Sequence, residues 1–331
     1  MKINESFDIK KVKELNYFTI ALKGRVELMI ALLDGRILIN YSYKNDEYKE
    51  KYKFYVYNLK NNNNCDICFD TDKIYNMIQM SDGNIIIKTI DRLKVINIKE
   101  KEIQNIQTLN NINGYLLRKL INESILIDSK KRFVIYEYTK GRLIYIKNSD
   151  YKMKKIDKIK EILDICTINN NEIVIYCEEK GKLFGSNYNL IFYDIKQNNL
   201  INDLSIGNAG YDAKIKLMNK NSLIAFKGGC ASDERKPELI LIDIQKRKIK
   251  NKIVLDNYFS EGVFIPLNEK IFLIYCECPV NDISMKIFQY EIENEKNLIK
   301  KGDKDFKNDY IIKYYDNKII IAKGARISLY G

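Results

Sequence analysis

Two pairs of cysteines are the residues best spaced for metal chemistry. Cys65 and Cys68 form a Cys-x-x-Cys pattern, and Cys276 and Cys278 form a Cys-x-Cys pattern. A structural zinc site needs four ligands that converge in tetrahedral geometry, whereas these pairs stand in well separated parts of the chain. Because a cysteine without a metal commonly packs as a small apolar residue, we expect incidental or buried thiols and no metal site.

Histidine is absent from the chain. Its absence removes imidazole acid–base catalysis, Ser/His and Cys/His nucleophile pairs and imidazole metal ligands. Three adjacent carboxylate pairs remain, each near lysine in a polar segment: Asp46–Glu47, Glu178–Glu179 and Asp233–Glu234. Solvated, charge-balanced loops are the ordinary setting of such pairs. We therefore predict a protein that is not an enzyme and has no cofactor; an enzyme that uses carboxylates or a cofactor in a central channel is the alternative.

The cysteine count and the start of the chain indicate the compartment. The seven cysteines are an odd number, and the opening MKINESFDIKK has no apolar core like that of a signal peptide. No apolar run approaches the ~20 residues that span a bilayer. We expect reduced thiols in a cytosolic or nucleocytoplasmic protein without a transmembrane segment.

The net charge of +12 comes from 56 Lys and Arg against 44 Asp and Glu. A basic surface can serve nucleic acid or an anionic membrane. Only nine of these cations are Arg, the residue better suited to forked contacts with phosphate and base edges. Lys, Asn and Ile are all abundant, so a compositional bias explains the charge better than a selected polyanion site does.

A polar turn followed at once by an aliphatic strand recurs seven times, at intervals of about 40–50 residues. The copies are LLDGRILIN (32–40), MSDGNIIIK (80–88), LINESILID (120–128), INNNEIVIY (168–176), LMNKNSLIAF (217–226), PLNEKIFLIY (266–275) and YYDNKIIIA (314–322). One small sheet cannot bury both of its faces alone, so this period predicts small sheets packed face to face around a ring.

Each copy continues into a third strand that carries an aliphatic pair, then Tyr or Ile, then a polar residue. These strands are YVYNL (55–59), LKVINI (93–98), FVIYEY (133–138), LIFYDI (190–195), LILIDI (239–244), IFQYEI (287–292) and ISLYG (327–331). A charged turn and a fourth strand follow most of them, but the chain ends before the last copy has one. Residues 7–15 can supply that strand and cover the open sheet edge, while residues 16–25 have no clear assignment.

This layout resembles the WD40-like β-propeller superfamily over essentially the whole chain. The family's Trp-Asp dipeptide is replaced by Tyr57-Asn58, Ile96-Asn97, Tyr136-Glu137, Tyr193-Asp194, Ile242-Asp243, Tyr290-Glu291 and Tyr330-Gly331. The chain has no Gly-His dipeptide and no true Trp-Asp, so the hydrogen-bonded tetrad of the family cannot form. The resemblance implies an all-β, seven-bladed propeller of four-stranded antiparallel blades that acts as a binding platform.

The expected organisation is a single domain over residues 1–331. Its blades cover about 26–73, 74–111, 112–150, 160–208, 211–257, 258–305 and 310–331, the last completed by 7–15. In this superfamily the link between the second and third strands and the link to the next blade emerge on one face. Four second-to-third links are long: 41–53, 177–189, 227–238 and 276–284.

We therefore expect a loop-rich face over blades four to six and one that binds protein partners of unknown identity. Aromatic residues and arginine dominate such interfaces. The expected anchors are Tyr43, Tyr48, Phe184, Tyr188, Arg235 and Lys236.

The alternative is a propeller that binds RNA or an anionic membrane through its most basic segment, 150–161. The lysines of that segment are Lys152, Lys154, Lys155, Lys158 and Lys160.

Overall fold

The computed structural model describes most of the chain. The described residues are 11–15, 24–44, 50–58, 64–65, 73–100, 102–108, 117–120, 123–129, 132–139, 142–148, 159–180, 186–208, 212–229, 235–255, 261–278, 284–307, 311–315, 318–323 and 326–330. They fall into two compact units, one of residues 9–149 and 310–331 and one of residues 1–8 and 150–309, called here the 9–149 unit and the 150–309 unit. Within these described ranges no helix is long and apolar enough to cross a membrane.

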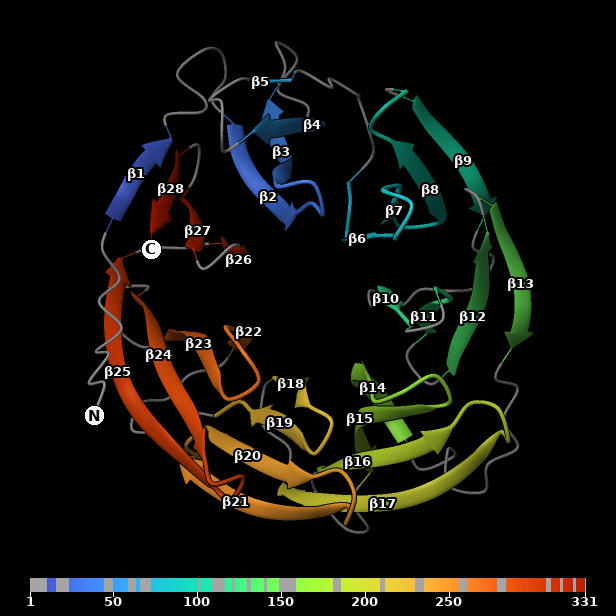
Figure 1. Cartoon of the computed structure of the whole chain (residues 1–331). Helices are drawn as coiled ribbons and strands as arrows, with labels where there is room; N and C mark the ends of the chain where they lie inside the picture. Colours follow the sequence, from blue (N-terminus) through green and yellow to red (C-terminus); the bar gives the residue numbers. More distant parts are fainter. Residues whose placement is uncertain are drawn as a thin grey trace. The chain divides into compact units, whose positions relative to one another are not determined.

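The described part of the 9–149 unit contains four antiparallel sheets of four strands each (Figure 1). One sheet consists of β2 (Gly24–Ala31), β3 (Arg36–Lys44), β4 (Glu50–Asn58) and β5 (Asn64–Cys65). The next consists of β6 (Asn76–Gln79), β7 (Ile85–Lys88), β8 (Arg92–Asn97) and β9 (Glu102–Thr108). The third consists of β10 (Leu117–Lys119), β11 (Ile125–Ser129), β12 (Arg132–Thr139) and β13 (Arg142–Asn148). The fourth joins β26 (Ile311–Tyr315), β27 (Lys318–Lys323) and β28 (Arg326–Tyr330) to β1 (Lys11–Leu15).

The described part of the 150–309 unit contains three sheets with the same strand order. The first is β14 (Ile159–Thr167), β15 (Glu172–Lys180), β16 (Ser186–Asp194) and β17 (Asn199–Asn208). The second is β18 (Ala213–Asn219), β19 (Ser222–Lys227), β20 (Glu238–Asp243) and β21 (Lys248–Val254). The third is β22 (Glu261–Pro266), β23 (Ile271–Cys278), β24 (Ser284–Glu293) and β25 (Asn297–Lys307).

The strand from the start of the chain completes the sheet at its end, as predicted. β1 pairs antiparallel with β28, with Glu14 opposite Ser328 and Leu15 opposite Ile327. The prediction assigned residues 7–15 to this strand, and 11–15 are the part that the structure describes. The arrangement of all sheets as one domain stays a prediction.

The recurring polar turn between first and second strands is held by its own side chains. Asp82 Oδ1 accepts the N–H of Asn84 at 2.9 Å, and Asn169 Oδ1 accepts the N–H of Asn171 at 2.9 Å. Asp and Asn favour turns because they can satisfy backbone donors in this way. Gly83 takes a φ of 90°, a left-handed conformation that glycine adopts without steric cost. In these two sheets the local chemistry therefore fixes where the first strand turns into the second.

In the dipeptides that replace Trp-Asp, the first residue packs in the core and the second stabilises the turn that follows. The Tyr or Ile is buried, at most 6% exposed, in Tyr57, Ile96, Tyr136, Tyr193, Ile242 and Tyr290. The polar residue that follows caps the next turn: Asn97 Oδ1 accepts the N–H groups of Lys99 and Glu100, and Asp194 Oδ1 accepts that of Gln197 at 2.7 Å. These contacts are local, so they form without the tetrad of the family.

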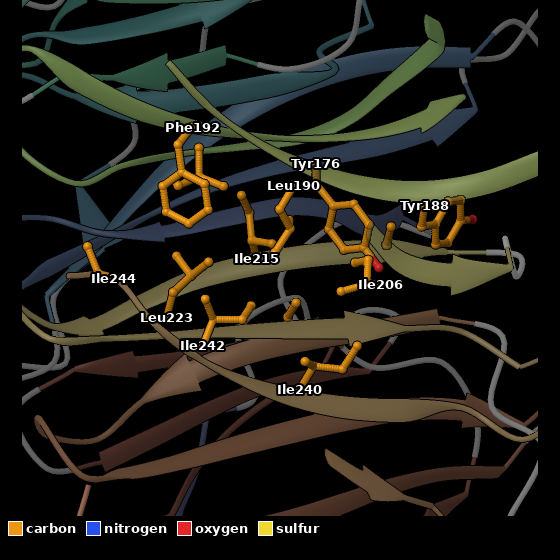
Figure 2. Close-up of a cluster of buried hydrophobic side chains, with 13 residues drawn as sticks. Tyr176, Tyr188, Leu190, Phe192, Ile206, Ile215, Leu223, Ile240, Ile242 and Ile244 are labelled. Atoms are coloured by element: carbon orange, nitrogen blue, oxygen red, sulfur yellow. The ribbon is translucent and has the colours of Figure 1, made fainter. Parts of the chain in front are cut away.

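The hydrophobic core lies between neighbouring sheets. Figure 2 shows the cluster in which sheet β14–β17, through Leu190 and Phe192, meets sheet β18–β21, through Ile215, Leu223 and Ile242. The opposite face of sheet β18–β21 packs in a second cluster against sheet β22–β25. Since both faces of this sheet are buried at its centre, the central strands β19 and β20 are apolar at nearly every position rather than at alternate ones.

One short segment folds differently from its sequence pattern. Residues 156–163 have a weak helical periodicity, but β14 begins at Ile159 and pairs with β15. The described apolar residues of that pattern include Ile159 and Ile162, and both are buried in the strand, at 2% and 6% exposed.

Candidate interaction surface

The predicted long loops of the 150–309 unit are in large part extensions of strands. Of the segment 177–189, β15 takes the residues to Lys180 and β16 takes those from Ser186, and Glu178 stands opposite Tyr188 in the hairpin. The segment 276–284 likewise belongs to β23 up to Cys278 and to β24 from Ser284. The polar composition of these segments suggested loops, but main-chain pairing continues through them because its register is already set by the apolar strand before them.

The segment 41–53 of the other unit behaves in the same way. β3 extends to Lys44 and β4 begins at Glu50, with Tyr43 opposite Lys51. The end of each sheet at which its second and third strands are joined is called its link end below.

The link ends of the three sheets in the 150–309 unit lie on the same side. The Nζ of Lys227, at the end of β19, is 3.8 Å from the position that a Cβ on Gly207, near the end of β17, would occupy. Asp212, just before β18, accepts the N–H of Gly262 near the start of β22, at 3.2 Å. All four residues belong to link ends, so these contacts join the three ends into one surface, called here the link face.

In sheet β18–β21 the two ends of the segment that links β19 to β20 pack closely against each other. A Cβ added to Gly229 would lie 2.7 Å from the carbonyl oxygen of Arg235 and 2.8 Å from Pro237 Cδ, so only glycine fits there. The N–H of Leu255 donates to the carbonyl of Pro237 at 2.9 Å. The segment 235–237 is therefore held against the ends of β19 and β21, and it presents Arg235 and Lys236 to solvent.

A network of ion pairs lies beside this link. Glu238 Oε1 contacts Lys227 Nζ at 3.0 Å, and Glu238 Oε2 is 3.8 Å from Lys252 Nζ. At the start of β18, Asp212 Oδ1 contacts Lys214 Nζ at 3.0 Å. The two carboxylates described at this link end, those of Glu238 and Asp212, are thus already engaged by lysines.

The predicted aromatic anchors differ in their placement. Tyr43 is half-buried, with Lys53 Nζ 4.9 Å above its ring and the ring of Tyr41 6.0 Å away. Tyr48 and Phe184 lie outside the described residues.

Tyr188 is only 2% exposed and packs edge-on against Tyr176, with ring centroids 5.3 Å apart (Figure 2). Its burial gives it a packing role between sheets β14–β17 and β18–β21.

The basic segment 150–161 is described only at its end. Lys160 contacts Glu178 Oε1 at 2.9 Å, and this hydrogen bond raises the pKa of the lysine. Lys152, Lys154, Lys155 and Lys158 lie outside the described residues. The one lysine that can be placed is therefore engaged by a carboxylate.

Comparison with known proteins identifies the fold. No protein-family model matches the chain, and no curated protein matches it in sequence. A solved structure does match: the β-propeller domain of Cps50 (Swd1) from Myceliophteria thermophila, with a TM-score of 0.63, 9% identity and coverage of 98% of this chain and 99% of that one. The chain folds as a β-propeller. At this identity the likeness establishes the fold alone, and the sheets described above are its blades.

The propeller also contains a buried hydrogen bond between blades that was not predicted from the sequence. Asp164, 3% exposed, accepts the N–H of its neighbour Ile165 and, with Oδ2 at 3.0 Å, that of Ile215 in the next blade. Hydrogen bonds to a buried carboxylate are among the stronger ones in proteins. A single Asp in a largely apolar strand could have suggested a buried hydrogen bond. The residue that donates to it could not be predicted, because it depends on how the two blades are aligned.

Few of the residues that could serve catalysis or metal binding have described side chains. Glu178 is paired with Lys160, and Asp46, Glu47, Asp233 and Glu234 lie outside the described residues. Cys68 also lies outside them, and the side chains of Cys65, Cys276 and Cys278 are not described. In the described part of the chain, no three His, Cys, Asp or Glu side chains gather as a metal site would require.

Proposed function

We propose that this WD40-like propeller is a non-enzymatic scaffold that binds other proteins through its link face, in the cytosol or the nucleus. One observation carries the proposal. In blades β14–β17 and β22–β25 the hairpin between the second and third strands is long. In blade β18–β21, which lies between them, the segment that links these strands is held by close packing at Gly229. Rigid blades that hold variable connections on one side are a common way to build a binding site.

The exposed charge of the link face supports the same function. Arg235 and Lys236 are exposed on the middle blade, and they belong to a segment whose backbone is fixed by Gly229 and Pro237. A side chain on an ordered backbone loses less entropy on binding than one on a mobile loop, which favours affinity.

Shortening the two hairpins tests the proposal. In one variant, residues 181–185 and 279–283 are each replaced by Asn-Gly, a dipeptide that closes a two-residue hairpin. The full chain and the variant are used as bait for affinity purification from the native source, and the captured proteins are then purified and titrated directly against both. We expect the variant to keep its thermal unfolding transition and to lose direct binding.

The matched control is Lys196→Ala, at an exposed turn on the opposite end of blade β14–β17. This change should leave partner binding intact. Equal binding by the full chain and the shortened variant would overturn the assignment of function to the link face.

A further inference from the structure

We propose that the turn end of blade β18–β21 binds the phosphate backbone of a double-stranded nucleic acid. The turn end of a blade is the end opposite its link end, where the first strand turns into the second and the third into the fourth. The binding surface, called here the basic turn patch, consists of Lys220, Lys246 and Lys248. Such binding would be an addition to the scaffold function proposed for the link face and does not depend on it.

Two turns of this blade bring the three lysines together. Lys220 lies in the turn between β18 and β19, and Lys246 lies in the turn between β20 and β21. The N–H of Ile244 donates to the carbonyl of Asn221 at 3.1 Å, which holds the two turns side by side. Lys248 is the first residue of β21 and follows the second turn directly. All three lysines are exposed, and every residue of both turns is described.

The carboxylates described beside the patch are each matched by a cation that is not part of it. Asp243, at the end of β20, is 8% exposed. Its Oδ1 accepts the N–H of Lys246 at 2.9 Å, and its Oδ2 lies 3.4 Å from Lys250 Nζ. Glu172 of the preceding blade is 3.4 Å from the Nη2 of Arg247. The charge of the three patch lysines therefore remains in surplus.

Three acidic residues of this blade lie outside the described part of the chain, and they continue the chain from the link end of the blade. They are Asp233, Glu234 and Asp256. Along the chain they follow β19 and β21, whose last residues stand at the link end. Strands of six or seven residues span about 20 Å, which separates the patch from the strand ends that lead into these residues.

The turn ends of the two neighbouring blades carry no such surplus. Each combines lysine with at least as many carboxylates. These residues are Asp194 and Lys196 in the preceding blade, and Glu269, Lys270, Glu293, Glu295 and Lys296 in the following one. The Nδ2 of Asn219 donates to the Glu269 carbonyl at 2.9 Å, so the turn ends of the last two blades lie on the same side. A general excess of lysine in the composition would charge the three turn ends alike, which is not what they show.

The chemistry of the patch favours the backbone of a duplex over other polyanions. Lysine acts as a compact point charge toward phosphate, and phosphate contacts need no side chain that reads a base. The two turns of the patch contain no aromatic residue on which unpaired bases could stack. A planar anionic membrane would also meet the exposed carboxylates of Glu293 and Glu295 on the neighbouring blade, whereas a duplex can lie across one blade.

The test uses the full-length protein and short fluorescent duplexes, with binding followed by fluorescence anisotropy. We expect two DNA duplexes of unrelated sequence to bind alike, because phosphate contacts carry no sequence information. The logarithm of the association constant should fall linearly with that of the salt concentration, with a slope of about −3 if each patch lysine neutralises one phosphate. An RNA duplex of equal length distinguishes the two sources of such a backbone, since the duplex that binds more tightly is the ligand class.

Variants then locate the site. Lys220→Ala, Lys246→Ala and Lys248→Ala should each make the salt dependence shallower by about 1 in slope. Lys246→Glu with Lys248→Glu should weaken binding at low salt by at least about tenfold. The matched control is Lys270→Glu with Lys296→Glu, which makes the same change of net charge at the turn end of the neighbouring blade and should weaken binding far less. Because all these lysines are exposed, every variant should keep the thermal unfolding transition of the natural protein.

Several outcomes would overturn the inference. Undetectable binding at low salt would do so, as would an affinity independent of salt or equal losses in the patch and control variants. Tighter binding to vesicles that contain phosphatidylserine, with the same lysines required, would assign the patch to a membrane instead. If duplex binding fails while purified partners still bind the link face, the scaffold function stands and the basic turn patch fails.

Discussion

At the scale of single residues, Tyr176 is a polar side chain in an apolar setting. Its side chain is fully buried in the cluster between two blades, and its hydroxyl has no hydrogen-bond partner among the described residues. Burial is the main cause that raises the pKa of this phenol well above its usual value, and the nearby Tyr188, Asp212 and Glu238 raise it further. The phenol is therefore neutral, and no hydrogen bond within the described residues offsets the free-energy cost of removing its hydroxyl from water.

We predict that Tyr176→Phe raises the free energy of unfolding by about 1 kcal/mol, because an unsatisfied buried hydroxyl costs stability that phenylalanine avoids. The matched change is Tyr193→Phe in the same blade. The Tyr193 hydroxyl donates to Asn198 Oδ1 at 2.6 Å, so its loss should lower the free energy of unfolding by about 1 kcal/mol. Urea unfolding of both variants measures the difference, and a larger loss for Tyr176→Phe than for Tyr193→Phe would show that the Tyr176 hydroxyl is satisfied.

At the scale of elements, the turn between β20 and β21 ties one blade to the next through Arg247. The Nη2 of Arg247 is 3.4 Å from Glu172 Oε1 in blade β14–β17, and its guanidinium carbon lies 5.9 Å from the centre of the Phe192 ring. The Asn202 amide of that blade donates to the Arg247 carbonyl at 3.4 Å. Arg247 makes these contacts with a φ of 51°, a left-handed conformation that costs a non-glycine residue about 1–2 kcal/mol.

Replacements at position 247 separate the contacts from the strain. Arg247→Ala removes the side-chain contacts and keeps the strained backbone, whereas Arg247→Gly removes the contacts and relieves the strain. We expect the alanine variant to unfold about 1 kcal/mol more easily than the glycine variant, and Arg247→Lys to lie between glycine and the natural protein. Equal stability of the alanine and glycine variants, measured by urea unfolding, would show that the turn carries no strain.

The same scale shows how far the sequence determines the structure. The strands and the turns at Asp82 and Asn169 were predictable because aliphatic runs and Asx turns are local signals. The length of the extended hairpins was not predictable, because their Lys, Tyr and Asn residues are typical of loops. Their strand pairing follows from the register of the apolar strands that precede them. The Asp164 tie and the burial of Tyr188 depend on how neighbouring blades meet, which no local pattern encodes. The exposure of Arg235 and Lys236 was predictable, but the close packing of their segment against Gly229 was not.

At the scale of the whole molecule, stability is shared between blades. Blade β18–β21 contributes Leu239 and Leu241 to the cluster with blade β22–β25, and Ile240 and Ile242 to the cluster with blade β14–β17. A blade that buries both faces against neighbours has no complete core of its own. The last blade depends on the two ends of the chain in addition, because its outer strand β1 comes from the start of the sequence and the other three come from the end.

Removal of residues 1–15 should therefore destabilise a region far away in sequence. Without β1, the N–H and C=O groups along one side of β28 lose their pairing, and an open strand edge promotes association with other chains. We expect a melting temperature lower by several degrees and a shift toward oligomers in light scattering, while removal of residues 1–8 alone leaves both unchanged because β1 remains. A synthetic peptide of residues 7–16, added in excess to the shortened chain, should restore the melting temperature by pairing with β28 as β1 does. A shortened chain that stays monomeric with an unchanged melting temperature would show that the β1–β28 pairing contributes nothing to the stability of the last blade.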